Sequence, residues 1–317
     1  MKAVALGGGH GLAASLQALT QVTDDLTAIV TVADDGGSSG RLRDELGLLP
    51  PGDLRMALCA LAGTDDWATS WQQLLQHRFP GEGPLGGHAV GNLILAGLAE
   101  TAGGIVPALD LVGRLIGARG RVLPASCVPL RIVAEVIGLD PDDRGDVRRV
   151  VGQVAVATTA GDVAALHLEP ADPPACREAV QAVLNADVVV LGPGSWFTSV
   201  LPHLLVPDLR QALVTTRALR VIVLNLAEQA GETAGFSPEA HLEVLAAHAS
   251  DLVPDVVLAD SEAVRESRGL MSAVEAVGGR LVLAPLALGD GTPRHDSQRL
   301  ADAYRQITSN VRGTAWR

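Results

Sequence analysis

Short apolar runs along the chain alternate with stretches in which apolar residues recur every three or four positions. The runs have the length of buried strands, and the longer stretches are typical of the helices that cover such strands. This alternation predicts an α/β, Rossmann-like fold: a mostly parallel sheet with helices on both faces. The expected strands are 3–6, 27–32, 188–191, 221–226, 256–258 and 281–283. The expected helices are 12–19, 53–62, 69–76, 90–100, 106–116, 176–185 and 297–307, with another starting at Ser237-Pro238. Two segments, 121–123 and 128–136, fit either type.

Residues 151–170 do not follow this alternation. Two apolar stretches, 154–158 and 164–168, flank Ala160-Gly161-Asp162, whose residue types are those of a tight turn. The pattern predicts a small β-hairpin insert near 151–170. Because the α/β alternation resumes after it, we expect one domain over residues 1–317.

The composition indicates a full apolar core and an acidic surface. Hydrophobic residues make up 48% of the 317 residues, and the formal net charge is −12. General binding to nucleic acids or anionic membranes needs an extended positive surface, so we expect neither partner. No run of about 20 apolar residues is free of charges and turn residues, and glycines follow the first short apolar run too soon for a signal peptide.

The cysteines indicate a reducing compartment. Cys59, Cys127 and Cys176 are odd in number and far apart in the sequence. They form no CxxC motif and no cluster with histidines, so a zinc site is not expected. Reduced thiols in a cytoplasmic protein are the interpretation that fits.

The densest polar chemistry follows the expected strand 27–32. Glycines let backbone N–H groups approach a ligand, arginines neutralise phosphate, and carboxylates accept from sugar hydroxyls or hold Mg²⁺. The candidate ligand-binding residues here are Asp34, Asp35, Gly36, Gly37, Ser38, Ser39 and Arg43. Asp34 and Asp35 are also the candidate Mg²⁺ ligands. A solvated turn is the alternative.

A glycine loop joins the first expected strand to the first expected helix. Gly8, Gly9, His10 and Gly11 lie where unpaired N–H groups and the helix dipole favour an anion such as a phosphate. Asp34 falls 23 residues after Gly11, near the position of the ribose-binding acid in dinucleotide folds. The alternative is a tight turn that only satisfies packing.

Two helix starts add further polar groups. Asp53 either caps the helix that begins there or belongs to the site, whereas Arg55 opposes the helix dipole and needs an anionic partner. His88 and Asn92 lie one turn apart on the same side of a helix and can contact a base, sugar or phosphate. For His88 the alternative is a core histidine bonded to the backbone.

Later strand ends repeat the logic of the first glycine loop. A glycine turn follows the buried strand 188–191, and polar loops follow the strands after it. Tight turns, solvated loops and surface charge are the alternatives. The candidate binding residues here are Gly192, Gly194, Ser195, Thr198, Asn225, Glu232, Thr233 and Arg294, the last as a clamp for a diphosphate.

Six motifs in this order resemble the YvcK family of gluconeogenesis factors, which are similar to the transferase CofD. They are Gly7–Leu12, Thr27–Arg43, Leu49–Arg55, Gly87–Leu93, Gly192–Ser195 and Gly231–Thr233. The resemblance runs from residue 1 to about residue 310. The chain departs from the family pattern at His10, where the family commonly has Thr, at Trp196-Phe197, where it has Leu-Tyr, and in 225–232.

The resemblance implies a CofD-like fold in the bacterial cytoplasm and a nucleotide-sugar ligand, UDP-N-acetylglucosamine or UDP-glucose. It implies a regulatory role in cell shape and wall synthesis on gluconeogenic carbon sources, with no established reaction. One rival is a CofD-type transferase that uses a nucleotide-diphosphate-linked donor and Mg²⁺ held by Asp34 or Asp35. Another is an NAD-linked oxidoreductase with His88 as proton donor. A homodimer is compatible with the fold class, and the sequence names no downstream protein partner.

Overall fold

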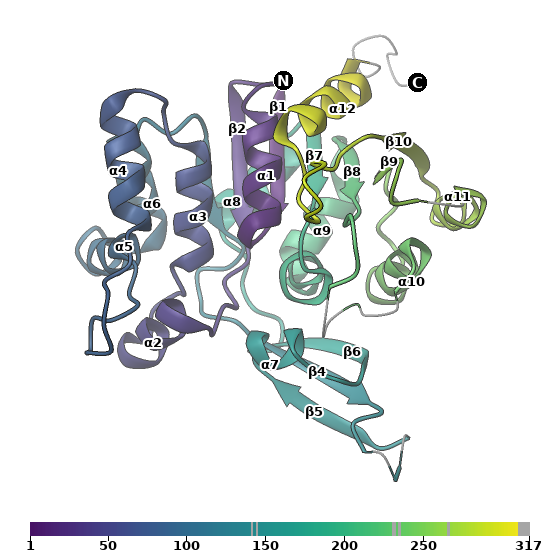
Figure 1. The fold of residues 1–317 in the computed structure, drawn as a ribbon, viewed down its shortest axis with the longest axis horizontal. Coiled ribbons are helices and arrows are strands. Elements are labelled where there is room, and N and C mark those ends of the chain that lie inside the picture. The colour runs from purple at the N-terminus through teal and green to yellow at the C-terminus, as the bar shows by residue number, and fades with distance from the viewer. Residues whose placement is uncertain (141, 144, 230–232, 234–235, 265–266, 310–317) are drawn as a thin grey trace.

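The computed structural model describes residues 1–140, 142–143, 145–229, 233, 236–264 and 267–309 (Figure 1). Within them the main sheet has seven parallel strands in the order β10-β9-β8-β7-β1-β2-β3. Their bounds are β1 (Lys2–Gly7), β2 (Asp25–Val30), β3 (Arg121–Pro124), β7 (Val188–Leu191), β8 (Leu219–Val223), β9 (Val256–Asp260) and β10 (Arg280–Ala284). The α/β prediction is confirmed, and 121–123 is a strand.

The burial of the central strands explains why their sequences read as continuous apolar runs. All four residues of β7 are buried, and β1 is buried from Ala3 to Gly7. A strand that is covered on both faces has no solvent side to which polar residues could point. The order of strands reverses between β1 and β7, where β1 has β2 on one side and the later strand on the other.

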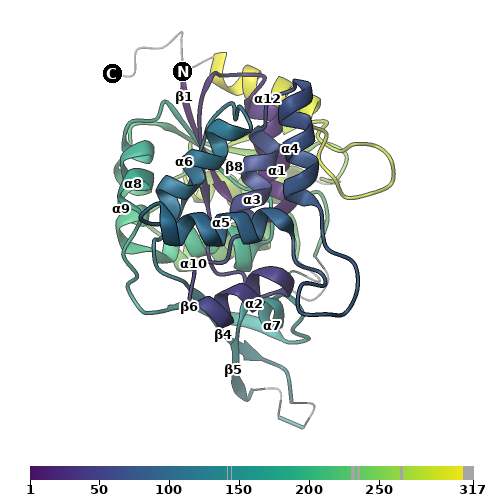
Figure 2. The ribbon, with the colours of Figure 1, turned by 90° about the vertical axis from the view of Figure 1, so that its left-hand side faces the viewer.

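Helices cover both faces of this sheet (Figure 2). One face carries α1 (Gly9–Leu19), α3 (Gly52–Leu61) and α12 (Ser297–Ser309), and the other carries α8 (Arg177–Leu184) and α9 (Pro207–Thr215). The remaining helices are α2 (Gly37–Leu46), α4 (Asp66–Gln76), α5 (Val90–Thr101), α6 (Ile105–Leu115), the short α7 (Gln153–Ala157), the turns η1 (Trp196–Val200) and η2 (Leu201–Leu205), α10 (Pro238–His248) and α11 (Ser267–Ala276). Ser237 caps α10 as expected, since its side chain accepts from the amide of Ala240 at 3.3 Å.

A small antiparallel sheet projects beyond the carboxyl ends of the main strands (Figure 1). It consists of β4 (Arg131–Ile137) between β5 (Val147–Val151) and β6 (Asp162–Glu169). The hairpin predicted near 151–170 is therefore wrong in detail. The first arm of the predicted hairpin is the short helix α7 (Gln153–Ala157). The second arm, β6, pairs with β4, and the sequence of β4 fits a strand and a helix equally.

None of the helices in the described part of the chain is long and apolar enough to cross a lipid bilayer.

Candidate nucleotide-binding site

The polar motifs gather at the carboxyl edge of the main sheet, where the strand order reverses. The loops after β1, β2, β7 and β8 all leave the sheet at this edge because these neighbouring strands are parallel. Open α/β sheets bind ligands at such a switch point. The edge faces the small sheet, which lies below it in Figure 1.

The first glycine loop, which follows β1, and the second, which is the glycine turn 192–194 after β7, are in direct contact at this switch point. A methyl group added at Gly11 would overlap the carbonyl oxygen of Pro193, so only glycine permits the approach. The second loop is held in turn from β8: the amide of Gly194 donates to Asn225 Oδ1 at 3.0 Å, and Asn225 Nδ2 donates to the Gly194 carbonyl at 2.9 Å. Backbone contacts and one amide side chain thus hold the loops after β1 and β7 together.

Asp53 reaches the first glycine loop rather than capping its own helix. Pro51 occupies the N-cap of α3 and makes no side-chain cap, so the capping interpretation of Asp53 is wrong. The Asp53 carboxylate instead lies against this loop: a methyl group at Gly8 would be 2.6 Å from its Oδ2, and the nearby Gly9 amide stabilises its charged form. Burial, followed by the neighbouring charge of Asp34, raises the pKa of Asp53 to about 7 against an ordinary 3.8, although the Gly9 amide and Arg55 oppose the shift.

The two carboxylates after β2 have different structural partners. Asp34 Oδ1 accepts from the amide of Gly36 at 2.9 Å, and a methyl group at Gly52 would lie 3.1 Å from Asp34 Oδ2. Asp35 faces the short helix α7, and its Oδ1 accepts from the amide of Val154 there at 3.0 Å. Asp34 therefore borders the start of α3, whereas Asp35 ties α7 to the loop that follows β2.

Residues 36–39 form the start of a helix that the sequence analysis did not predict. Gly36 is the N-cap of α2, and Ser38 and Ser39 are buried in its first turn. Ser39 Oγ accepts from the amide of Gly52 at 3.0 Å. Since residues 52 and 53 contact both this helix start and Gly9, the two proposed phosphate-binding segments lie on one edge of the molecule.

A buried chain of hydrogen bonds connects α3, α5 and α2. Arg55 Nε donates to Asn92 Oδ1 at 2.9 Å, and Asn92 Nδ2 donates to Ser38 Oγ at 2.9 Å. Ser38 Oγ is bonded in turn to His88 Nδ1 at 3.0 Å. Burial, aided by the nearby charge of Arg41, lowers the pKa of His88. These four predicted residues are side by side and hold the start of α2 in place.

Two buried polar atoms in the segment 31–43, which follows β2, have no hydrogen-bond partner among the described residues. One is Arg43 Nη1, whose guanidinium lies near Asp35, Asp34 and Arg131; burial, followed by Arg131, lowers its pKa. The other is Thr31 Oγ1, directly after β2. A methyl group at Gly8 would lie 2.9 Å from Thr31 Cγ2 and 3.1 Å from Ser199 Oγ. Thr31 and Ser199 are not among the residues predicted from the sequence, although a hydroxyl in an otherwise apolar run was a signal for Thr31.

Several predicted residues are exposed or serve local structure. His10 is exposed in the first turn of α1, and Gly37 is exposed at the start of α2 with φ of 48°. Ser195 caps η1 and is bonded to Thr198, and Thr233 closes a turn by accepting from the amide of Gln229 at 2.9 Å. Arg294 is exposed in the turn before α12. Glu232 lies outside the described residues.

A cavity of about 380 Å³ adjoins Asn225 at the ends of β8 and β9. Asp260 is in its lining, but this carboxylate accepts from the amides of Glu262, Ala263, Leu286 and Ala287 at 2.6 to 3.0 Å. Its hydrogen bonds therefore stabilise these loops. Within the described residues, no three His, Cys, Asp or Glu side chains are arranged to hold a metal ion.

Comparison with known proteins links these motifs to one family. The chain matches the family model described as 2-phospho-L-lactate transferase CofD over residues 3–276. A Mycobacterium tuberculosis protein provisionally named as a gluconeogenesis factor is 54% identical over 301 residues, covering 94% of this chain and 87% of that protein. The gluconeogenesis factor of Listeria monocytogenes is 34% identical, over 98% of this chain and 96% of its own. A crystal structure of a UPF0052 family member from Bacillus halodurans has a TM-score of 0.84 at 34% identity, covering 95% of this chain and 97% of that one.

Proposed function

This chain belongs to the CofD family, among its gluconeogenesis factors, and from that premise we propose that it is a nucleotide-sugar-binding regulatory protein. Its ligand is UDP-N-acetylglucosamine or UDP-glucose. It acts in the bacterial cytoplasm, with a homodimer as the candidate assembly, and supports cell shape and wall synthesis on gluconeogenic carbon sources. The observation that carries the proposal is the contact between Gly11 and Pro193, which brings two glycine loops together at the switch point.

In this proposal the diphosphate lies across the first glycine loop and the N-terminus of α2. Helix starts offer unpaired N–H groups and a favourable dipole to an anion, and α1 and α2 both begin at this edge. Arg43 has a buried N–H group without a partner in the described chain, which a phosphate oxygen would satisfy. Asp34 would read a sugar hydroxyl, and Arg294 would add charge from the turn before α12.

Thermal-shift measurements with UDP-N-acetylglucosamine, UDP-glucose, GDP, NAD and a deazaflavin, each with and without Mg²⁺, test this function. A ligand at a hundredfold its Kd adds about 2.7 kcal/mol to the stability of the native state, which raises Tm. We expect a shift with a UDP-sugar that Arg43→Ala or Asp34→Ala removes. The control is Arg217→Ala, an exposed arginine two residues before β8 and hence at the opposite edge of the sheet. Absence of a shift with both UDP-sugars contradicts the proposal.

The second candidate is a CofD-type transferase with a nucleotide-diphosphate-linked donor. The proximity of Asp34 and Asp53 favours it, because their mutual repulsion is one that a bound Mg²⁺ would relieve. In that case both carboxylates would hold the cation and the cation would neutralise the donor's phosphates. Formation of a product from a deazaflavin and such a donor, only when Mg²⁺ is added, would establish this function in place of the first.

A further inference from the structure

Two short segments far apart in the sequence bring a pair of cysteines together beyond the end of β3. Ser126 and Ala175 form an antiparallel bridge, and the amide of Cys176 donates to the carbonyl of Ala125 at 3.0 Å. Ser126 Oγ also donates to the carbonyl of Pro174 at 2.6 Å. These bonds hold the backbone just before Cys127 against the backbone from Pro174 to Cys176, and so the fold itself brings the two cysteines close together.

The two thiols lie close enough to affect each other's pKa, but they differ in exposure. Cys127 is exposed, whereas Cys176 is fully buried and its Sγ donates to Glu178 Oε2 at 3.4 Å. The single S–H of Cys176 is shared between Glu178 and the Cys127 sulfur; its interaction with Cys127 lowers the pKa of Cys127 to about 7, and the same interaction, together with burial, raises the pKa of Cys176. A thiolate is the nucleophilic form of cysteine, so the exposed sulfur is the one suited to attack and the buried one suited to resolve.

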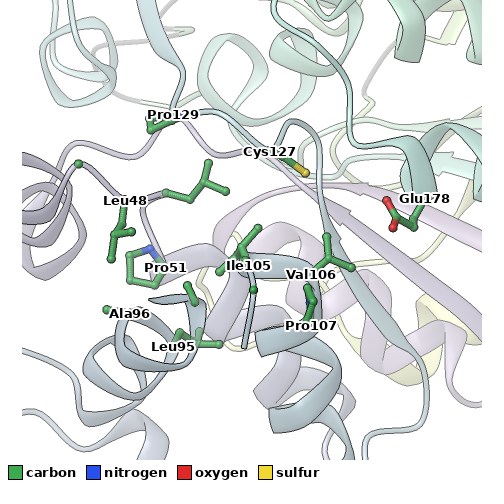
Figure 3. Close-up of a pocket in the computed structure, with 15 residues that line it drawn as sticks. Leu48, Pro51, Leu95, Ala96, Ile105, Val106, Pro107, Cys127, Pro129 and Glu178 are labelled. Carbon is green, nitrogen blue, oxygen red and sulfur yellow. The ribbon is translucent and has the colours of Figure 1, made fainter. Parts of the chain in front are cut away.

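An apolar cavity of about 520 Å³ opens beside this pair (Figure 3). Its lining is contributed by α5, α6 and the loops around residues 48 and 129, with aliphatic side chains such as Leu48, Leu95, Ile105, Val106 and Pro129. Figure 3 shows the Cys127 sulfur between these side chains and Glu178. A small molecule that reaches Cys127 through the cavity is therefore favoured if it carries an apolar group.

We propose that Cys127 and Cys176 are a redox-active thiol pair that an organic hydroperoxide with an apolar group oxidises to a disulfide. The Cys127 thiolate attacks the terminal oxygen of the O–O bond, which breaks, and the departing alkoxide takes a proton and leaves as the alcohol. Cys127 is then a sulfenic acid. The Cys176 sulfur attacks the Cys127 sulfur, the S–S bond forms, and the hydroxyl group leaves as water with the Cys176 proton. Two thiols are oxidised by two electrons, and one hydroperoxide is reduced.

The third cysteine supplies an internal reference. Cys59 is buried in α3, and burial raises its pKa to about 11 despite the nearby charge of Arg55. We expect it to stay reduced under conditions that oxidise the pair. Loss of two thiols per chain, with one thiol retained, is the expected result.

The experiment treats the whole protein with cumene hydroperoxide or hydrogen peroxide and follows thiol loss and intact mass. The wild type should lose two hydrogen atoms in mass, with Cys127 and Cys176 in one cross-linked peptide pair. Cys176→Ser should stop at a sulfenic acid that dimedone traps on Cys127, and Cys127→Ser should not react at either remaining cysteine. An intact mass without this loss, or a cross-link between other cysteines, overturns the thiol pair.

The role of the cavity is tested by the rate constants for oxidation of Cys127 by cumene hydroperoxide and by hydrogen peroxide. Their ratio is divided by the same ratio for free cysteine, which removes the difference in intrinsic reactivity between the two oxidants. Ala99→Leu adds three carbon atoms to the cavity lining. It should slow oxidation by cumene hydroperoxide about tenfold, the effect of crowding an apolar pocket by a few methylenes, and leave the hydrogen peroxide rate unchanged. The control is Thr101→Leu, an exposed position on the same helix outside the lining. If Ala99→Leu alters both rates equally, or neither, no apolar oxidant uses the cavity.

Discussion

The side-chain amide of Asn225, at the end of β8, is hydrogen-bonded at both its oxygen and its nitrogen to the backbone of Gly194, after β7. Gly194 in turn follows Pro193, against which Gly11 packs. One side chain thus fixes the loop that meets the first glycine loop. The candidate site depends on this chain of contacts across three neighbouring strands.

Replacing Asn225 by Asp should be more damaging than replacing it by Ala. The aspartate keeps an acceptor for the Gly194 amide but places a second oxygen against the Gly194 carbonyl, where the amide nitrogen donated. For Asn225→Asp we expect a loss of about 1–3 kcal/mol in the free energy of unfolding, the cost of leaving a polar group without a partner where water is excluded. Urea denaturation of both variants measures it. Equal stability of Asn225→Asp and wild type would mean that this contact does not hold the loop.

Gly11→Ala should separate the two glycine loops. The added methyl group overlaps the Pro193 carbonyl oxygen, which is backbone and cannot rotate away. We expect a loss of about 1–3 kcal/mol, in the range of overpacked cores, together with loss of the UDP-sugar thermal shift.

The matched control is Gly97→Ala, in the middle of α5, where a methyl group meets nothing within 4 Å. This change should raise stability by about 0.5–1 kcal/mol because alanine restricts the unfolded chain and favours helix. The comparison of the two variants by urea denaturation distinguishes a steric effect from a general intolerance of glycine substitution.

Asp53→Asn should remove a pH dependence of stability. The pKa of Asp53 is about 7 in the fold and 3.8 ordinarily, so between these values the folded protein binds more protons than the unfolded chain. Its contribution to stability therefore falls as the pH rises from 4 to 7. At pH 8 we expect the variant to be more stable than wild type by up to about 4 kcal/mol, the free energy that corresponds to a pKa of about 7 in place of 3.8.

Urea unfolding at pH 5 and pH 8 checks this prediction, with Asp302→Asn on the exposed face of α12 as the control. Should wild type and Asp53→Asn lose stability in parallel between these pH values, the Asp53 carboxyl does not titrate in this range.

Asn92→Ala should destabilise the junction of α2, α3 and α5. It leaves the buried Arg55 Nε without its acceptor and removes a donor to Ser38. Bonds to charged groups contribute about 1.5–3 kcal/mol, and we expect a loss of that size. The control is Thr101→Ala at the end of the same helix, an exposed position that should change stability by less than about 0.5 kcal/mol. A loss no larger than that of the control would show that the chain of bonds contributes little to stability.

Much of the fold could be predicted from the sequence because burial imposes local patterns. A strand covered on both faces reads as an apolar run, and Val188–Leu191 and Val256–Asp260 are strands for that reason. The short helix α2 was missed because its sequence, from Gly37 to Leu46, contains two glycines and only two apolar residues, so it has no apolar stripe. The small sheet was misread because its central strand pairs with two partners at different distances along the chain.

The sequence by itself determined that glycines, hydroxyls and carboxylates follow successive strands, and parallel strands necessarily bring such ends to one edge. Which loops touch was decided only by the tertiary structure, because contact depends on the order of strands in the sheet and that order is not local. Gly11 meets Pro193, Asp53 meets Gly9, and Cys127 meets Cys176 across separations that no periodicity encodes. The raised pKa of Asp53 has the same origin, since burial and a neighbouring charge exist only once the chain has folded.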